Sequence, residues 1–246
     1  MPIEAVIFDL DGTLLKTEKL KALSYAKAAV ELCPYSLTES EAIEAFKDFV
    51  GLSRQEVAQG LIDRFDLSAK AEKRQAEFGV STAWQAFVQV RLAYYQAMIA
   101  DPQVLHDNQW SHTIDLLHTV RAEGCKVGLA TMSYCQQVSY ILDTLDMRDQ
   151  FNFVATRDDV TNGKPDAEIY HLVADHLGVS PNNTLVIEDS PSGVQAAINA
   201  GMHVIAVSTP FTKTGLRTLA DLDPHWIVDD PAEQLLPRVR ELIQDL

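Results

Sequence analysis

Short apolar runs rich in β-branched residues alternate with helical patterns along most of this chain, and that alternation limits the folds open to it. Six runs are typical of buried strands: 5–8, 126–130, 152–155, 184–187, 203–207 and 226–228. Amphipathic helical patterns follow or separate the later runs, at 110–123, 136–147, 167–177, 194–200 and 232–243. Strands that alternate with helices of this length predict an α/β fold with a doubly wound, parallel, Rossmann-like sheet.

The stretch from 16 to 100 interrupts this alternation. It has no convincing strand pattern, and helical periodicity covers 17–32, 38–50, 54–65 and 82–99, punctuated by Pro34, Gly51 and Gly79. We therefore predict a core at 1–15, an inserted all-helical cap domain at 16–100, and the rest of the core at 101–246. Asp101-Pro102 is the expected return hinge. A block inserted just after the first strand is well placed to cover a site at that strand's end.

Two carboxylates follow the first strand in the sequence Asp9-Leu10-Asp11-Gly12-Thr13. Ligands of open α/β sheets bind where parallel strands end. There Asp9 is a candidate nucleophile and ligand of a hard cation, and Asp11 a candidate proton carrier. Gly12 permits a turn without a Cβ clash, and the Thr13 hydroxyl can meet a phosphate. A plain Asp-Gly turn is the competing interpretation.

Further polar groups follow at the end of the second strand and in a later loop. Thr131 closes the second strand and can offer a hydroxyl to a phosphoryl oxygen, or it can cap the next helix. Lys164 precedes a proline and can bridge Asp9 and a phosphate. At 4 Å such a charge pair is worth about 4 kcal/mol at an effective dielectric near 20, which is enough to decide whether an anion approaches a carboxylate. A solvated loop lysine is the alternative.

Glu188 and Asp189 end the strand at 184–187. Asp189 is the candidate second carboxylate on the cation, and Glu188 is either another ligand or its outer neighbour. Mg²⁺ suits this set because it favours carboxylates, water and substrate phosphate. An acidic turn is the alternative.

These pieces together resemble the haloacid dehalogenase superfamily over nearly the whole chain. The matching motifs are Asp9–Thr13, Thr131, Lys164-Pro165, and Glu188-Asp189-Ser190 with Gly193. The helical block resembles the family's first-type cap. The resemblance implies phosphoryl transfer through an aspartyl-phosphate on Asp9, with Mg²⁺ held by Asp9, Asp189 and the backbone carbonyl of Asp11.

The cap resembles that of the β-phosphoglucomutase-like subfamily, which contains sugar phosphatases and sugar phosphomutases. Gly51-Leu52-Ser53-Arg54 is similar to its substrate-specificity loop, so Arg54 is expected to hold a distal phosphate or acidic group of the substrate, with Ser53 beside it. An N-capping Ser53 followed by a surface arginine is the competing interpretation. Arg91, Lys21 and Ser133 are further candidate substrate contacts. A solvated helix face is an equal alternative for Arg91.

Asp11 and the first cap helix favour one activity within that subfamily. Relatives that cleave carbon–halogen or carbon–phosphorus bonds usually lack the carboxylate at Asp11, so phosphate-ester chemistry is expected. The mutases resemble one another in having a histidine early in the first cap helix, where this chain has no histidine between Lys16 and Lys21. The sequence therefore predicts a phosphatase acting on a small phosphorylated metabolite, with a phosphomutase as the alternative.

The composition argues against binding to polyanions. The chain has 246 residues with 35 acidic and 20 basic side chains, for a formal net charge of −15. This charge is a poor match to nucleic acid or an anionic membrane. Three cysteines without a pairing pattern, and an N-terminus without signal-peptide character, are typical of a cytoplasmic protein. We expect a monomer or weak dimer.

Overall fold

The computed structural model describes residues 3–33, 35–50, 52–229 and 231–245. Pro34 and Gly51, which were expected to punctuate the helical block, lie outside the described residues, as do 1–2, 230 and 246. The chain divides into two compact units, Met1–Lys16 with Leu105–Leu246, and Thr17–Val104. The second boundary falls inside α7 (Pro102–Asp107), a short helix at the place where the sequence suggested a hinge.

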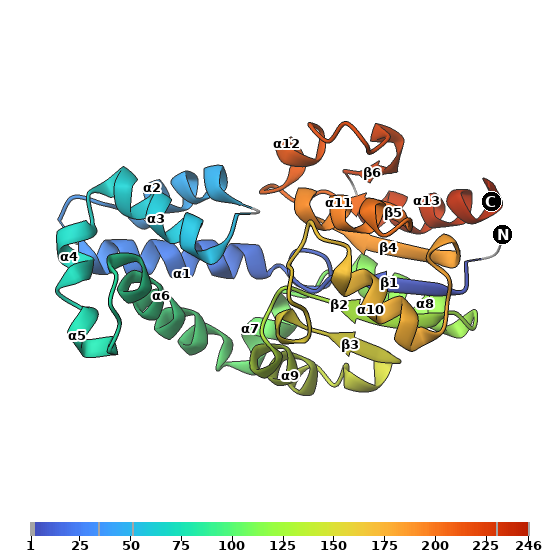
Figure 1. The fold of residues 1–246 in the computed structure, drawn as a ribbon, viewed down its shortest axis with the longest axis horizontal. Coiled ribbons are helices and arrows are strands. Elements are labelled where there is room, and N and C mark those ends of the chain that lie inside the picture. Colours follow the sequence, from blue (N-terminus) through green and yellow to red (C-terminus); the bar gives the residue numbers. More distant parts are fainter. Residues whose placement is uncertain (1–2, 34, 51, 230, 246) are drawn as a thin grey trace. The chain divides into compact units, whose positions relative to one another are not determined.

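The first unit contains a six-stranded sheet in which every pair of neighbours is parallel. The strands are β1 (Ala5–Phe8), β2 (Lys126–Ala130), β3 (Phe153–Ala155), β4 (Thr184–Glu188), β5 (His203–Val207) and β6 (Ile227–Val228), in the spatial order β3-β2-β1-β4-β5-β6. The predicted doubly wound α/β sheet is confirmed. The first strand in sequence lies in the middle of the sheet, because later strands add on both sides of it (Figure 1).

Helices cover both faces of this sheet (Figure 1). The helices of the first unit beyond α7 are α8 (Ser111–Ala122), α9 (Cys135–Thr144), α10 (Glu168–Leu177), α11 (Pro191–Asn199), α12 (Lys213–Leu216) and α13 (Pro231–Asp245). On one face α10 packs on β1, β2 and β3, and α11 on β4 and β5; α8 and α13 contact each other and the sheet as a second group. Each βα crossover therefore ends with its polar loop at the same edge of the sheet.

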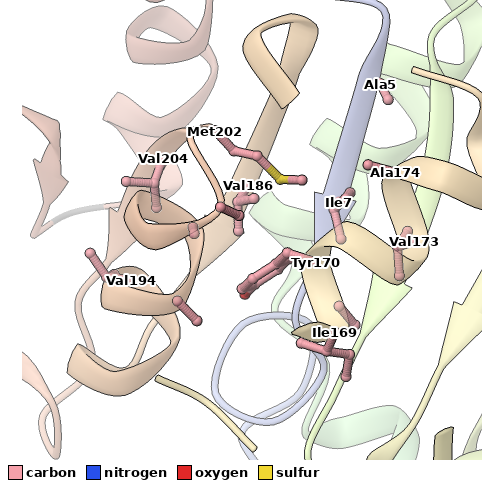
Figure 2. Packing of buried hydrophobic residues seen from close by; sticks show 14 of the residues in the cluster. Ala5, Ile7, Ile169, Tyr170, Val173, Ala174, Val186, Val194, Met202 and Val204 are labelled. Carbon is pink, nitrogen blue, oxygen red and sulfur yellow. The ribbon is translucent and has the colours of Figure 1, made fainter. Parts of the chain in front are cut away.

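The core between α10, α11 and the sheet is almost free of water-exposed atoms. Ile7, Tyr170, Val173 and Val186 are all fully buried, and Figure 2 shows the Tyr170 ring between the α10 side and the α11 side of this cluster. Burying one such aliphatic or aromatic side chain is worth about 1.5–3 kcal/mol. This burial fixes the position of α10 relative to the ends of the strands.

The second unit is all-helical over its described residues. It comprises α1 (Thr17–Leu32), α2 (Glu39–Phe46), α3 (Arg54–Phe65), α4 (Ser68–Glu72), α5 (Gln75–Phe78) and α6 (Ala83–Ile99). Capping boxes start three of these helices, at Thr38, Ser53 and Thr82. Tyr25 lies in its core, with ring centroids 5.5 Å from Phe46 and 5.9 Å from Phe87. The predicted α1 and α3 have the observed bounds, whereas the short α4 and α5 were not predicted.

Two features bear on the expected environment of the protein. Over the described stretches, no helix has both the length and the apolar character that crossing a bilayer requires. Cys33, Cys125 and Cys135 are free thiols.

Candidate active site

The strand register brings the predicted motifs to one level of the sheet. Phe8 is paired with Leu129 on β2 and with Ile187 on β4. The residue that follows on each strand is therefore level with the others: Asp9, Ala130 and Glu188. The backbone N–H of Asp9 donates to the carbonyl of Ile187 at 3.0 Å, which keeps Asp9 in line with the sheet after β1 ends.

Lys164 joins the ends of these three central strands through one ammonium group. Its Nζ donates to Asp9 Oδ1 at 2.7 Å, to the Ala130 carbonyl at 3.0 Å and to Glu188 Oε1 at 2.7 Å. Only 3% of the side chain is exposed, so the interpretation of Lys164 as a solvated loop lysine is wrong. Burial alone would lower the pKa of Lys164, but the Asp9 and Glu188 carboxylates outweigh it and raise that pKa well above its ordinary value.

Asp9 has an unusual environment for a carboxylate. It is 6% exposed. Burial raises the pKa of Asp9 to about 7; the Lys164 ammonium opposes this shift, and the nearby Glu188 and Asp11 charges add to it. The pKa is raised even with the Lys164 ammonium beside the carboxyl, so further positive charge, such as a bound cation, would favour the ionised form.

Glu188 is fully occupied by hydrogen bonds. Its Oε1 accepts from Lys164 Nζ at 2.7 Å and from the Tyr170 hydroxyl at 3.2 Å. Its Oε2 accepts from the backbone N–H groups of Asp189 and Ser190, each at 2.8 Å, and from Ser190 Oγ at 3.0 Å. Because both oxygens are saturated, Glu188 suits the role of orienting Lys164 and the loop after β4 better than that of a direct cation ligand.

The oxygens of Asp9, Glu188 and Asp189 form a buried acidic group in which the facing atoms lie within 4.8 Å of one another. Gly12 lies against Asp189: its φ is +94°, and a Cβ there would overlap the Asp189 carboxylate. The backbone of the loop after β1 thus approaches Asp189 as closely as only glycine allows. Hard oxygen donors in this arrangement fit Mg²⁺, which Asp9 and Asp189 could hold through their carboxylates.

The predicted phosphate-binding hydroxyls are buried near the same strand ends. The Thr131 hydroxyl accepts from the backbone N–H of Ser133 at 3.1 Å, and α9 has Tyr134 at its N-cap position, so the capping role for Thr131 is wrong. Thr13 is fully buried, and its hydroxyl has no hydrogen-bond partner among the residues that the structure describes. Ser133 donates its hydroxyl to Asp11 Oδ2.

Two residues that support Lys164 and Glu188, Tyr170 and Glu168, were not among the predicted site residues. Tyr170 lies on the apolar face of α10, and periodicity assigns such a residue to the core. Its hydroxyl nevertheless reaches Glu188, and the Lys164 ammonium lies 5.0 Å from its ring centroid. Glu168 accepts from the backbone N–H groups of Thr161 and Asn162 at 2.8 and 2.7 Å, which fixes the loop that leads to Lys164.

Arg91, in the helical unit, is buried between two aromatic rings. Its guanidinium lies 4.9 Å from the ring centroid of Tyr25 and 4.7 Å from that of Tyr95, and the residue is 4% exposed. The interpretation of Arg91 as part of a solvated helix face is therefore wrong. Burial raises the pKa of Tyr25, and the positive charges of Arg91 and Arg54 oppose that shift.

The other candidate substrate contacts of the helical unit have simpler surroundings. Ser53 is the N-cap of α3, and its hydroxyl accepts from the Glu56 N–H at 3.3 Å, as the capping interpretation predicts. Arg54 is the first residue of that helix and is partly buried. Lys21 is partly buried on α1, and its carbonyl accepts from the Ser24 hydroxyl at 2.6 Å.

Comparisons with known proteins agree with this geometry. The family model described as haloacid dehalogenase-like hydrolase matches residues 6–207. A phosphorylated carbohydrates phosphatase of Thermotoga maritima is 29% identical over 203 residues, covering 82% of this chain and 84% of the relative. A phosphoglycolate phosphatase of Salmonella typhimurium is 30% identical over 247 residues, covering 96% and 92%.

A solved structure shows the same fold. The crystal structure of beta-phosphoglucomutase from Clostridium difficile covers 99% of this chain and 98% of its own, with a TM-score of 0.69 at 22% identity. The family match spans the central sheet from β1 to β5 and includes all four motifs. This chain therefore belongs to the haloacid dehalogenase-like hydrolases, and it has the β-phosphoglucomutase-like fold within that family.

Proposed function

We propose that this protein is a Mg²⁺-dependent phosphatase that hydrolyses a small phosphorylated metabolite, such as a sugar phosphate, through a phosphoryl group carried on Asp9. The observation that carries the proposal is the Lys164 ammonium. It contacts Asp9, the end of β2 and Glu188 on β4 at once, so that positive charge is fixed beside a carboxylate at the sheet edge. The names of the two phosphatase relatives support the reaction class.

In this proposal Asp9 is the nucleophile and Asp11 is the general acid and base. A carboxylate oxygen of Asp9 attacks phosphorus, the ester P–O bond breaks, and Asp11 gives its proton to the departing alkoxide. Water then attacks the phosphoryl group on Asp9 while Asp11 takes a proton from it, which frees phosphate and restores both groups. Lys164 offsets the repulsion between the anionic substrate and Asp9; one such pair at 4 Å is worth about 4 kcal/mol at an effective dielectric near 20.

A bound Mg²⁺ would stabilise the charge of the transferring phosphoryl group and help to hold it in line with the attacking oxygen. Asp9, Asp189 and the backbone carbonyl of Asp11 are the proposed ligands. Thr131 and Thr13, both fully buried at the loops that follow β2 and β1, are the proposed hydroxyl contacts of the phosphoryl oxygens. Glu188 keeps Lys164 oriented rather than binding the ion.

The helical unit is the proposed cap that recognises the rest of the substrate. The guanidinium of Arg91 is fixed between Tyr25 and Tyr95, and Arg54 lies close enough for its charge to act on Tyr25 as well. Two cations around one phenol favour a substrate with a second acidic group, such as a carboxylate or another phosphate. Lys21 adds positive charge on α1. Ser53 already caps α3, which weakens its case as a substrate contact.

The test is phosphate release from a panel of sugar phosphates and phosphorylated acids, with Mg²⁺ and with chelator. We expect release from at least one compound in the presence of Mg²⁺ only, and none from Asp9→Asn. The matched control is Asp175→Asn, at an exposed position on α10. A folded protein that releases no phosphate from any compound contradicts the proposal. Conversion of a hexose 1-phosphate to its 6-phosphate without net release would replace it with a phosphomutase.

A further inference from the structure

A hydroxyl–carboxylate contact joins two of the loops at the catalytic edge. Ser133, in the turn between β2 and α9, donates its hydroxyl proton to Oδ2 of Asp11, in the loop after β1. The residues are 122 positions apart in the sequence, so the contact depends on the parallel pairing of β1 with β2. Ser133 is only 6% exposed. Shielding from water strengthens a hydrogen bond to a carboxylate.

The backbone of Ser133 is fixed on both sides. Its N–H donates to the hydroxyl of Thr131 at 3.1 Å, and its carbonyl accepts from the N–H of Arg157 at 3.1 Å. Thr131 is fully buried at the end of β2, and Arg157 begins the short 3₁₀ helix after β3. The position of the Ser133 hydroxyl is therefore fixed by backbone contacts to the ends of two neighbouring strands, β2 and β3.

Asp11 directly precedes the turn after β1, where its backbone forms a β-bridge with Leu15. The next residue, Gly12, has a φ of +94°, and the Asp11 side chain is only partly buried. A carboxyl side chain adopts one of a few staggered rotamers, and a fixed donor such as the Ser133 hydroxyl favours the rotamer that reaches it. A serine hydroxyl has a single proton to donate. Because that proton points to Asp11, Ser133 is not a donor to the substrate in this arrangement, which differs from its expected role as a substrate contact.

We infer that Ser133 is a positioning residue: it holds the Asp11 carboxyl in the rotamer that delivers a proton to the leaving oxygen. The inference rests on the proposed function, in which Asp11 is the proton carrier. Oδ2 accepts the Ser133 hydroxyl whether Asp11 is ionised or neutral, and the proton in transit is carried on Oδ1. It moves from Oδ1 to the departing alkoxide in the first step and returns to Oδ1 from the attacking water in the second.

Two phosphate esters separate this role from a merely structural one. An alkyl phosphate, taken from the panel compound that the wild type hydrolyses fastest, leaves as an alkoxide and needs the proton. p-Nitrophenyl phosphate leaves as a stable phenolate and does not. The parameter to compare is kcat/KM, because it reports the steps up to the first irreversible one, the transfer to Asp9.

We expect Ser133→Ala to lower kcat/KM for the alkyl ester on the order of tenfold or more, because acid–base catalysis as a whole contributes a factor of ~10²–10⁴. The kcat/KM for p-nitrophenyl phosphate should stay within about twofold of the wild-type value. Ser133→Thr, which keeps the hydroxyl, should recover most of the loss. In an Asp11→Asn background, Ser133→Ala should cause no further loss, because no acid remains to be positioned.

Equal losses with both esters, or no loss with either, would overturn the inference while leaving the phosphatase proposal intact. So would a further loss of alkyl-ester hydrolysis in the Asp11→Asn background. A wild-type protein that hydrolyses neither ester overturns the proposed function and this inference together. If Ser133→Ala does not fold, Ser133→Thr and Ser133→Cys provide the same comparison, since the cysteine thiol is a weaker donor and should give an intermediate loss that is again confined to the alkyl ester.

Discussion

Gly193 should not tolerate a methyl group, although its place in a helix favours alanine. It lies in the first turn of α11, and Ser190 caps that helix by accepting the Gly193 N–H at 3.1 Å. A Cβ built at Gly193 would lie no farther than 2.5 Å from any of the three carboxyl atoms of Glu188. The helix can therefore gain a side chain only if Glu188 moves.

The magnitudes of the two effects are unequal. Exchanging glycine for alanine inside a helix stabilises it by about 1 kcal/mol. Glu188 accepts five hydrogen bonds, among them those from Lys164 and Tyr170, and each bond to a charged group is worth about 1.5–3 kcal/mol. Loss of two of the five costs about 3–6 kcal/mol. We therefore expect Gly193→Ala to lower the free energy of unfolding by about 2–5 kcal/mol and to lower phosphatase activity, because Lys164 loses one of its two carboxylate partners.

Urea unfolding followed by circular dichroism, together with the phosphate-release assay, measures both effects. The matched control is the same substitution in a Glu188→Ala background, where the overlapping carboxylate is absent. There helix propensity alone remains, and Gly193→Ala should be neutral or stabilising. The reasoning is refuted if Gly193→Ala is as stable as the wild type, or if its cost is the same in both backgrounds.

Three further substitutions test other contacts. Tyr170→Phe removes one hydrogen bond to Glu188 but keeps the ring beside Lys164, so it should lower the free energy of unfolding in urea by about 1.5–3 kcal/mol; a cost above about 4 kcal/mol would mean that the ring packing had also changed. Backbone N–H groups of Thr161 and Asn162 lower the pKa of Glu168. The stabilisation from this carboxylate is therefore present above the unfolded-state pKa of about 4.3 and is lost as pH falls through the lower folded-state value. The stability difference between wild type and Glu168→Gln should be full at neutral pH and shrink in acid; a constant difference contradicts this. Mg²⁺ at about 100 times its Kd should stabilise the wild type against unfolding by about 2.7 kcal/mol, and Asp189→Asn should lose most of that gain; equal gains would exclude Asp189 as a ligand.

The positions of the strands could be predicted because each is a short apolar run flanked by polar or turn-forming residues. The predicted bounds of β1, β2 and β5 match the structure, and β4 is one residue longer because Glu188 still pairs within the sheet. Helices of four or five residues, such as α4 and α5, are too short to display a periodicity, so they could not be predicted from the sequence pattern.

The approximate location of the site could also be predicted, because Asp9, Thr131 and Asp189 each follow a strand directly, and parallel strands end at one edge. The contacts between these segments could not. Whether Arg91 is solvated depends on Tyr25, which lies 66 positions away on another helix but in the same unit. The orientation of Glu188 depends on N–H groups of its own turn and on the missing side chain of Gly193. Such contacts arise from tertiary distances, which no local pattern encodes.

The charges around Asp9 are the reason why the proposed mechanism uses both a cation and a proton. Asp9, Asp11, Glu188 and Asp189 supply four carboxyl groups, and Lys164 is the single ammonium among the contacts described for them. Lys164 is shared between Asp9 and Glu188, so four carboxylates and one ammonium would leave three negative charges to face a phosphate. The proposed divalent ion would balance Asp9 and Asp189. In the proposed mechanism a proton on Asp11 would remove the remaining negative charge, and that proton is the one that Asp11 would give to the leaving group.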